Sequence, residues 1–320
     1  MSSNNKKSLR IVFMGTPDFA VGSLRTIVES GYLVAAVITA PDRPAGRGRK
    51  IQESAVKSFA VAQNLKVLQP VNLKDESFLD ELKSLEANLY IVVAFRMLPK
   101  VVWQIPKYGT FNLHASLLPQ YRGAAPINWA IINGETETGV TTFFIDEKID
   151  TGSVILQKKE KIHLDDTVGT LHDRLMDLGA KLVVETCKRI ADDDVSITVQ
   201  KNFENLKPAP KLNKENRKID WNISLKKIHD FIRGLSPYPA AWCYIVNGKK
   251  EEPIKIYKAK MEPTEHDYEI GKLILEKKEL NVATKDGFLR ILEVQLPGKR
   301  KMEIADILNG LNLDKNAYLR

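Results

Sequence analysis

The chain has 320 residues, which is longer than one average domain and predicts two. Hydrophobic residues make up 43% and charged residues 28%, as in a soluble globular protein, and no apolar run reaches the roughly 18 residues of a membrane-spanning helix. Residues 1–10 are polar and precede a strand-like run instead of a cleavable signal core, so we expect a cytoplasmic protein. Cys187 and Cys243 are too few for a disulfide framework or a zinc cluster.

The net charge of +8 is unevenly distributed along the chain. Residues 208–320 hold 22 lysines and arginines against 16 aspartates and glutamates, a net of +6. A basic segment beside a nearly neutral one favours a polyanionic partner, with nucleic acid as the first candidate. A surface that serves only solubility would carry the same charge.

Strand-like apolar runs alternate with helix-like segments over residues 9–190. The alternation predicts an α/β domain with an open, mostly parallel, Rossmann-like sheet. LYIVVAF, at residues 89–95, is typical of a strand buried on both faces. The other expected strands are 9–15, 33–39, 67–70, 109–116, 140–146 and 153–162. One expected helix begins at Pro17-Asp18, and three others cover residues 54–64, 75–85 and 167–190.

Two prolines in the segment 207–211 predict a domain boundary. We therefore expect a catalytic domain at 1–206, a linker at 207–218 and a second domain at 219–320. In the second domain a helical stretch at 222–235 is followed by short strands separated by Gly, Asn and Pro turns, which predict a small barrel or sandwich. We expect a β-barrel of the OB-like type. Its strands are 241–246, 254–261, 271–277, 279–285 and 288–296.

Three polar residues stand where expected strands end. Asn112 and His114 are two apart on one strand, so their side chains point to the same face. Asp150 follows another strand, in FFIDEKIDTG. An amide and an imidazole can bind a developing oxyanion, and a carboxylate can set the charge and orientation of the imidazole, so the set suits acyl transfer. Each residue alone is more often a turn former or a satisfied polar side chain.

The sequence around these residues resembles the folate-dependent formyltransferase family. The family pattern is Asn-x-His-x-Ser-Leu-Leu-Pro, an aromatic residue and Arg-Gly-x-x-Pro, followed later by Asp-Glu-x-x-Asp-x-Gly. The first element is matched by Asn112, His114, Ser116, Leu117, Leu118, Pro119, Tyr121, Arg122, Gly123 and Pro126. The second is matched by Asp146, Glu147, Asp150 and Gly152. The similarity also covers FMGTPDFA, PDRPAGRGRK and residues 219–242, and thus essentially the whole chain.

The resemblance implies a reaction and a set of site residues. Asn112, His114 and Asp150 would be catalytic, the co-substrate would be 10-formyltetrahydrofolate, and no cofactor would be tightly bound. The acceptor would be the α-amine of methionyl initiator tRNA, in support of translation initiation. The folate would bind at Ser116, Leu117, Leu118, Pro119, Arg96 and Leu98. For Leu117 and Leu118, packing in the core is an almost equally good interpretation.

The loop 41–50 is rich in arginine and glycine, which indicates a mobile cationic segment suited to phosphates. A solvated loop is the ordinary interpretation, but in the family this loop meets the acceptor arm of tRNA, and we take Arg47 as its critical contact. The basic second domain would hold the tRNA backbone. The predicted tRNA-binding residues are Arg43, Arg47, Arg49, Lys50, Lys211 and Lys214.

Other functions remain open within and outside the enzyme class. A sugar-nucleotide N-formyltransferase would share the three catalytic residues, generally without the arginine-rich loop. A 10-formyltetrahydrofolate hydrolase and a glycinamide ribonucleotide formyltransferase differ after the catalytic domain. A non-catalytic RNA- or folate-binding protein need not keep all three residues. Gly15-Thr16-Pro17 lacks the glycines of a dinucleotide fingerprint. We expect a monomer without metal or membrane attachment.

Overall fold

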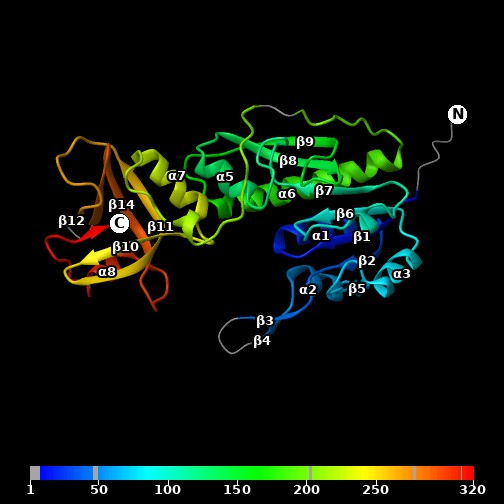
Figure 1. The fold of residues 1–320 in the computed structure, drawn as a ribbon, viewed down its shortest axis with the longest axis horizontal. Helices are drawn as coiled ribbons and strands as arrows, with labels where there is room; N and C mark the ends of the chain where they lie inside the picture. The colour runs from blue at the N-terminus through cyan, green and yellow to red at the C-terminus, as the bar shows by residue number, and fades with distance from the viewer. Residues whose placement is uncertain (1–7, 46–49, 202–203, 277–278, 311) are drawn as a thin grey trace. The chain divides into compact units, whose positions relative to one another are not determined.

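The computed structural model describes residues 8–45, 50–201, 204–276, 279–310 and 312–320 (Figure 1). The chain divides into two compact units. The first unit comprises Met1–Gly123, Thr138–Glu160 and His172–Pro208, and the second comprises Ala124–Glu137, Lys161–Leu171 and Ala209–Arg320. Among the described residues, no helix combines the length and the apolar character needed to cross a membrane.

The first unit is built on a seven-stranded sheet whose order does not follow the chain. From edge to edge the strands are β5 (Val67–Leu68), β2 (Leu33–Ile38), β1 (Arg10–Gly15), β6 (Leu89–Val93), β7 (Thr110–His114), β8 (Glu137–Phe144) and β9 (Val154–Lys161). The pairs from β5 through β7 are parallel, and β8 runs antiparallel to β7. The expected mostly parallel, Rossmann-like sheet is thereby confirmed, and the carboxyl ends of β1, β2, β6 and β7 share one edge.

Helices connect and cover the strands of this sheet (Figure 1). They are α1 (Asp18–Glu29), α2 (Ala55–Ala62), α3 (Glu76–Ser84), α4 (Lys100–Trp103) and α6 (Val168–Ala191). Side-chain caps begin two of them, since Ser54 accepts from the Lys57 amide and Asp75 from the Ser77 amide.

The core of the first unit lies against both faces of the sheet. On one face, alternate residues of β1, β2 and β6 pack with Phe78 and Leu82 of α3 and Val102 of α4. On the other face α6 packs closely, because a Cβ at its Gly179 would lie 2.7 Å from the Leu113 side chain. β6 is buried throughout, as its continuous apolar run predicts.

Several elements in the chain were not expected from its pattern, among them a strand pair in the arginine-rich loop and a helix after the Asn112–Gly123 block. The arginine-rich loop was predicted to have no fixed fold, but Arg43–Ala45 (β3) pairs antiparallel with Lys50–Gln52 (β4). Asp42 fixes the base of this strand pair, since it is paired with Lys57 and accepts from Gln69 Nε2 at 2.8 Å. Residues 46–49 lie outside the described residues, so the predicted mobility of the loop stays a prediction. A helix, α5 (Pro126–Ile132), follows the Asn112–Gly123 block and begins with a proline at a helical position that needs no amide donor.

The second unit contains an antiparallel barrel. Its strand order is β12 (Leu273–Glu276), β13 (Glu279–Thr284), β14 (Gly287–Gln295), β11 (Lys250–Glu262), β10 (Ala241–Asn247) and β16 (Tyr318–Leu319), with β15 (Met302–Glu303) on β14. The ends nearly close on each other, since the Leu319 amide donates to the Gly271 carbonyl at 2.8 Å. Gly271 has φ +86, and a Cβ there would lie 2.3 Å from the Leu319 oxygen. The predicted β-barrel is confirmed.

Short helices complete the second unit. They are the 3-10 turn η1 (Glu215–Arg217), α7 (Leu225–Leu235) and α8 (Ile304–Leu308). The apolar face of α7 packs against barrel residues through Leu225, Ile228 and Ile232. Both cysteines are buried, and burial raises the pKa of Cys187 to about 12, so neither thiol is disposed to act as a nucleophile.

Candidate active site

Asn112 and His114 lie near the carboxyl end of β7, where it adjoins β6 and β8. Asn112 pairs in register with Phe143 and His114 with Thr141. His114 is 6% exposed, whereas Asn112 is half-buried. Because residues two apart on a strand project from the same face, the amide and the imidazole face the same side of the sheet.

The two ring nitrogens of His114 face two different oxygen atoms. Nε2 lies 2.8 Å from the backbone oxygen of Tyr121, and Nδ1 lies 3.8 Å from Oδ2 of Asp150. The side chains of His114 and Asp150 are 7% and 14% exposed, so water screens the pair little. A carbonyl and an ionised carboxylate only accept, and an imidazolium with N–H on both nitrogens can donate toward both.

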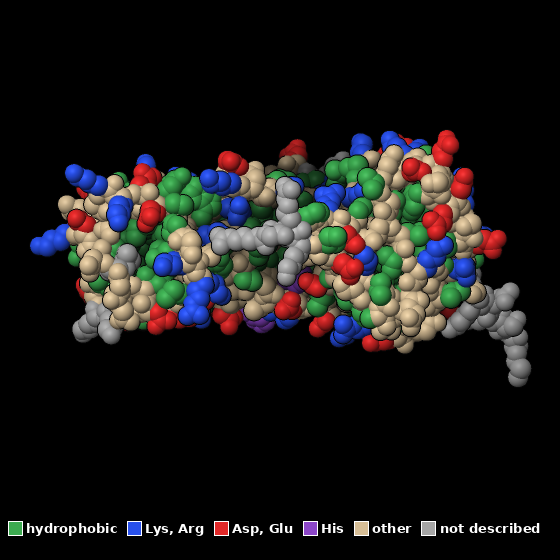
Figure 2. Space-filling model, turned by 90° about the horizontal axis from the view of Figure 1, so that it is seen from below, with side chains coloured by type: hydrophobic (Ala, Val, Ile, Leu, Met, Phe, Trp, Pro, Cys, Tyr) green, Lys and Arg blue, Asp and Glu red, His purple; other side chains and the backbone are tan. Residues whose placement is uncertain are grey.

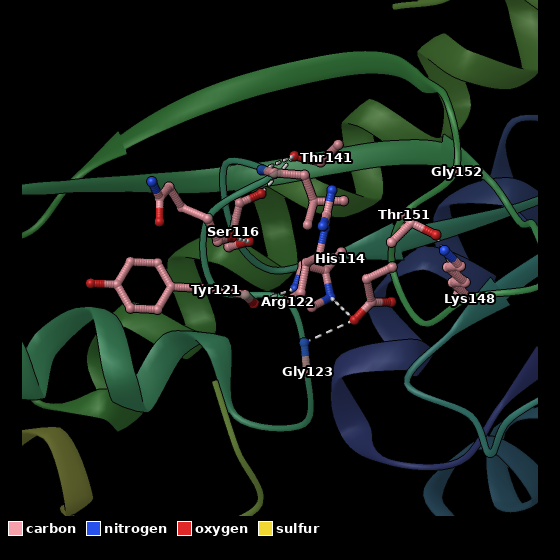
Figure 3. A network of polar contacts seen from close by, with 12 residues as sticks. His114, Ser116, Tyr121, Arg122, Gly123, Thr141, Lys148, Thr151 and Gly152 are labelled. Carbon is pink, nitrogen blue, oxygen red and sulfur yellow. Dashed lines mark hydrogen bonds and ion pairs between the residues drawn. The ribbon is translucent and has the colours of Figure 1, made fainter. Parts of the chain in front are cut away.

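The backbone of Gly123 also binds Asp150. Its amide donates to Oδ2 at 2.9 Å, so one carboxylate oxygen faces both the imidazole and this amide. Figure 3 shows the His114 ring and the Gly123 amide converging on that oxygen. Two segments far apart in the sequence therefore fix the direction of the carboxylate.

Asp150 lies in the loop between β8 and β9 with a backbone conformation that is uncommon for residues other than glycine. Its φ is +55, in the left-handed region. Asp146 stabilises the loop, accepting from the Lys148 amide at 3.0 Å and from the Thr151 hydroxyl at 2.7 Å. Gly152 lets the loop pass close to β8, since a Cβ there would lie 1.7 Å from the Phe144 oxygen. The second family motif thus supplies the hydrogen bonds and the close approach that this turn needs.

The Ser116–Pro119 segment, predicted to bind folate, is tied to β8. Ser116 is fully buried and its hydroxyl donates to the Gln120 carbonyl at 2.7 Å. Thr141 Oγ1 donates to the Ser116 carbonyl at 2.6 Å and lies 3.2 Å from the Leu118 amide (Figure 3). Leu118 is buried, whereas Leu117 and Pro119 are half-buried. Packing in the core explains why a leucine stands at position 118, whereas the Leu117 side chain keeps part of its surface exposed.

A shallow depression of about 360 Å³ lies beside the loop that follows β6. Its lining includes both predicted residues of that loop, Arg96 and Leu98, with the exposed Val71 and Met97. The Arg96 guanidinium donates to the Val71 carbonyl at 2.9 Å. Burial, and to a smaller extent the charge of Arg43, lowers the pKa of Arg96. Cationic and apolar groups therefore meet in one recess of the first unit.

The predicted tRNA-binding residues belong to two groups. Arg43 is exposed on β3, whereas Arg47, Arg49 and the Lys50 side chain lie outside the described residues. Lys211 and Lys214 are exposed in the second unit. Lys214 Nζ lies 5.3 Å from the centre of the Trp242 ring. On the face drawn in Figure 2, acidic side chains are interspersed with lysines and arginines.

Sequence reasoning missed Gln200, in the segment after α6. Its Nε2 donates to the carbonyls of Asp150 at 3.0 Å and Gly152 at 2.8 Å. Its Oε1 accepts from Arg122 Nη2 at 2.8 Å. No periodicity or composition distinguishes a single glutamine in an irregular segment, although the arginine beside it in space belongs to the recognised motif.

The described residues contain no cluster of His, Cys, Asp and Glu that could hold a metal ion. The His114 and Asp150 side chains lie within hydrogen-bond distance of the Tyr121 carbonyl and the Gly123 amide, respectively. Such an arrangement can bind a negatively charged oxygen and move a proton.

Comparison with known proteins identifies the class to which this site belongs. Residues 9–187, more than half of the chain, match the sequence profile described as formyl transferase. Residues 211–312 match the formyl transferase C-terminal domain. The chain belongs to the formyl transferase family.

Similar curated proteins come from several bacteria. The methionyl-tRNA formyltransferase of Flavobacterium johnsoniae is 60% identical over 311 residues, which cover 97% of this chain and 99% of that protein. The methionyl-tRNA formyltransferase of Parabacteroides distasonis is 56% identical over 312 residues, covering 95% and 96%. The similarity thus extends through both units.

Similar solved structures share the fold at lower identity. The sugar 3N-formyl transferase WlaRD, solved in the presence of dTDP and 5-N-formyl-THF, has a TM-score of 0.64 at 24% identity and covers 92% of this chain and 100% of its own. HypX from Aquifex aeolicus in complex with tetrahydrofolic acid has a TM-score of 0.63 at 20% identity, covering 96% and 49%. At these identities the similarity shows the fold.

Proposed function

We propose that this chain transfers the formyl group of 10-formyltetrahydrofolate to the α-amine of methionyl initiator tRNA. The observation that carries the proposal is the identity of 60%, over almost the full length of both chains, with a protein named methionyl-tRNA formyltransferase. The buried pair of His114 and Asp150 supports the chemistry, because an acyl transfer needs a group that stabilises an oxyanion.

In the proposed reaction the neutral amine attacks the formyl carbon. A free α-amine titrates at about 7.7–8, and the neighbouring ester lowers this value, so the nucleophile is available at neutral pH. The attack forms a C–N bond and places negative charge on the formyl oxygen. The tetrahedral species then collapses with cleavage of the bond to N10 of the folate, which takes up a proton while the amine loses one.

The three predicted catalytic residues divide these tasks. The Asn112 amide donates to the oxyanion together with the Nδ1–H of protonated His114, which at 3.8 Å from Asp150 Oδ2 makes no hydrogen bond to that carboxylate. Asp150 stabilises the positive charge of His114 across 3.8 Å and accepts the amine proton through water. The carboxylate can serve both roles because the Gly123 amide binds one of its oxygens and leaves the other available.

The folate is proposed to bind along the edge of the sheet near the site. Arg96 and Leu98 line the depression after β6, and Ser116, Leu117, Leu118 and Pro119 follow β7. The apolar rim of Val71 and Met97 suits a flat ring, and Arg96 supplies charge. The Flavobacterium relative extends over both units, so the C-terminal unit belongs to the proposed enzyme.

The tRNA is proposed to use the cationic residues of both units. Arg43, Arg47, Arg49 and Lys50 of the segment 41–50 would approach the acceptor arm. Lys211 and Lys214 would neutralise backbone phosphates. We assign catalysis to residues 1–206, a linker to 207–218 and tRNA binding to 219–320. The enzyme is proposed to act as a monomer in the cytoplasm, where initiator tRNA is charged.

The donor side of the reaction gives the first test. The chain is incubated with 10-formyltetrahydrofolate, with and without methionyl initiator tRNA, and tetrahydrofolate release is followed. We expect release that depends on the tRNA and equals the formyl-methionyl-tRNA formed. Release without tRNA would instead support a hydrolase and contradict the proposal.

A further inference from the structure

The Gln200 side chain links Arg122 to the backbone of the Asp150 loop. Oε1 accepts from Arg122 Nη2 at 2.8 Å and from Nε at 3.2 Å. On its other side, Nε2 donates to the carbonyl oxygens of Asp150 and Gly152, at 3.0 and 2.8 Å. Both hydrogens of the amide and its oxygen are thus used. The arginine, which only donates, fixes the orientation of the amide and directs its NH₂ group at the loop.

Arg122 and Gly123 hold Asp150 at two points. The Gly123 amide donates directly to the carboxylate at 2.9 Å, whereas Arg122 acts on the backbone through Gln200. Such restraint helps to keep Asp150 at φ +55, in a left-handed region that residues other than glycine adopt uncommonly, although aspartate tolerates it better than most. The carboxylate can face His114 Nδ1 only while this turn persists.

The segment that carries Gln200 is itself fixed to the first unit. Thr198 and Val154 exchange two backbone hydrogen bonds, each of 2.8 Å, two residues before Gln200. Lys207, further along, accepts from the Tyr121 amide at 2.7 Å. Gln200 therefore extends from a restrained backbone and can transmit that restraint to the loop.

We propose that Gln200 is a positioning residue for formyl transfer, which keeps Asp150 in its left-handed conformation and its carboxylate directed at His114. Gln200 does not touch the reacting atoms and acts through Asp150. The inference rests on the proposed function, since it assumes that the His114 and Asp150 pair carries out the transfer.

Two substitutions separate the hydrogen bonds of Gln200. Gln200→Met keeps the length of the side chain and removes all its hydrogen bonds. Gln200→Glu keeps an acceptor for Arg122 and loses the donor to the two carbonyls. If the donor side matters, both variants lower kcat by about 10- to 100-fold, the loss that follows a displacement of about 1 Å at a reacting group. The KM values for the folate and the tRNA stay within about twofold, because ground-state binding is not touched.

A double-mutant cycle with Asp150→Asn tests whether Gln200 acts through Asp150. Single-turnover rates are measured with excess enzyme, so that slow variants remain measurable. We expect Gln200→Met to lower the rate by no more than about twofold in the Asp150→Asn background, since two residues that act as one unit are not additive. Gln295→Met is the matched control, because Gln295 also accepts from a side chain, Tyr257, and donates to a carbonyl, that of Lys299.

Three results would overturn the inference. The first is normal kcat in either Gln200 variant, and the second is a raised KM with unchanged kcat. The third is an equal loss in the wild-type and Asp150→Asn backgrounds, which would indicate a general effect on folding. Failure of the proposed function is distinguishable, because the wild-type chain would then not formylate methionyl-tRNA at all.

Discussion

Asn112 is the residue whose proposed role can be measured most simply. It shares a face of β7 with His114, and its amide is assigned to the formyl oxyanion. We expect Asn112→Ala to lower the single-turnover rate by roughly 10²–10³-fold, the usual loss for one oxyanion donor. Asn222→Ala, at an exposed asparagine of the second unit, serves as the control and keeps the rate. A near-normal rate for Asn112→Ala would show that the amide is not an oxyanion donor.

The geometry of the Asp150 loop depends on a single residue, Gly152. A Cβ there would meet the Phe144 oxygen at 1.7 Å, so the backbone of the loop must move. We expect Gly152→Ala to lower kcat by about 10²-fold or more, because the carboxylate is displaced from His114. Gly310→Ala is the matched control, since nothing lies within 4 Å of its Cβ position. Unchanged kcat for Gly152→Ala would mean that the loop position is not needed for catalysis.

At the scale of elements, a buried ion pair within α7 involves the arginine that joins this helix to the segment before α6. Arg233 Nε donates to Asp230 at 2.7 Å, and its Nη1 donates to the carbonyls of His163 and Asp166 at 3.2 and 3.0 Å. Asp230 is 4% exposed and Arg233 8%. Removing the carboxylate leaves a buried positive charge without a counterion, which costs about 3–5 kcal/mol.

Asp230→Ala should therefore lower the free energy of unfolding by several kcal/mol in denaturant titrations. The control is Asp80→Ala, which breaks the exposed pair of Asp80 and Lys83 and should cost about 0–1 kcal/mol. Equal effects of the two substitutions would contradict the buried-pair interpretation.

The sequence predicted the elements whose signal is local. Apolar runs predicted the strands of the sheet, and the helical spacing of apolar residues predicted the long helix α6. Both signals are local, because buried side chains recur at a fixed spacing along a strand or a helix. The same period put Asn112 and His114 on one face. The short strands β3 and β4 were missed, since the arginines and glycines of the segment 41–50 indicate a loop. Their anchor, Asp42, is bound by the distant Lys57 and Gln69.

The parts of the site that depend on long-range contacts could not be predicted. Asp150 was identified by the family motif, but its distance from His114 depends on a left-handed turn and on the Gly123 amide. Gln200 binds carbonyls that are 50 and 48 residues away in the chain. No local rule gives such a contact, because a backbone carbonyl carries no sequence signal.

For the whole molecule, the excess positive charge predicts salt-dependent binding of tRNA. The logarithm of the binding constant falls linearly with the logarithm of the salt concentration, with a slope set by the number of phosphate contacts. We expect the Lys211→Ala, Lys214→Ala double variant to reduce this slope by about 2, one unit for each lost phosphate contact. Lys83→Ala, on an exposed helix of the first unit, should leave the slope unchanged. The same slope in the double variant and the wild type would remove both lysines from the tRNA site.

The acceptor is the central claim about the whole molecule. The most direct measurement compares kcat/KM for 10-formyltetrahydrofolate-dependent formylation of methionyl initiator tRNA and of an amino-sugar nucleotide by the wild-type chain. We predict N-formylmethionyl-tRNA as the product, with no formylated sugar above the rate without enzyme. Formylation of the sugar nucleotide, with methionyl-tRNA left unmodified, would contradict the assignment.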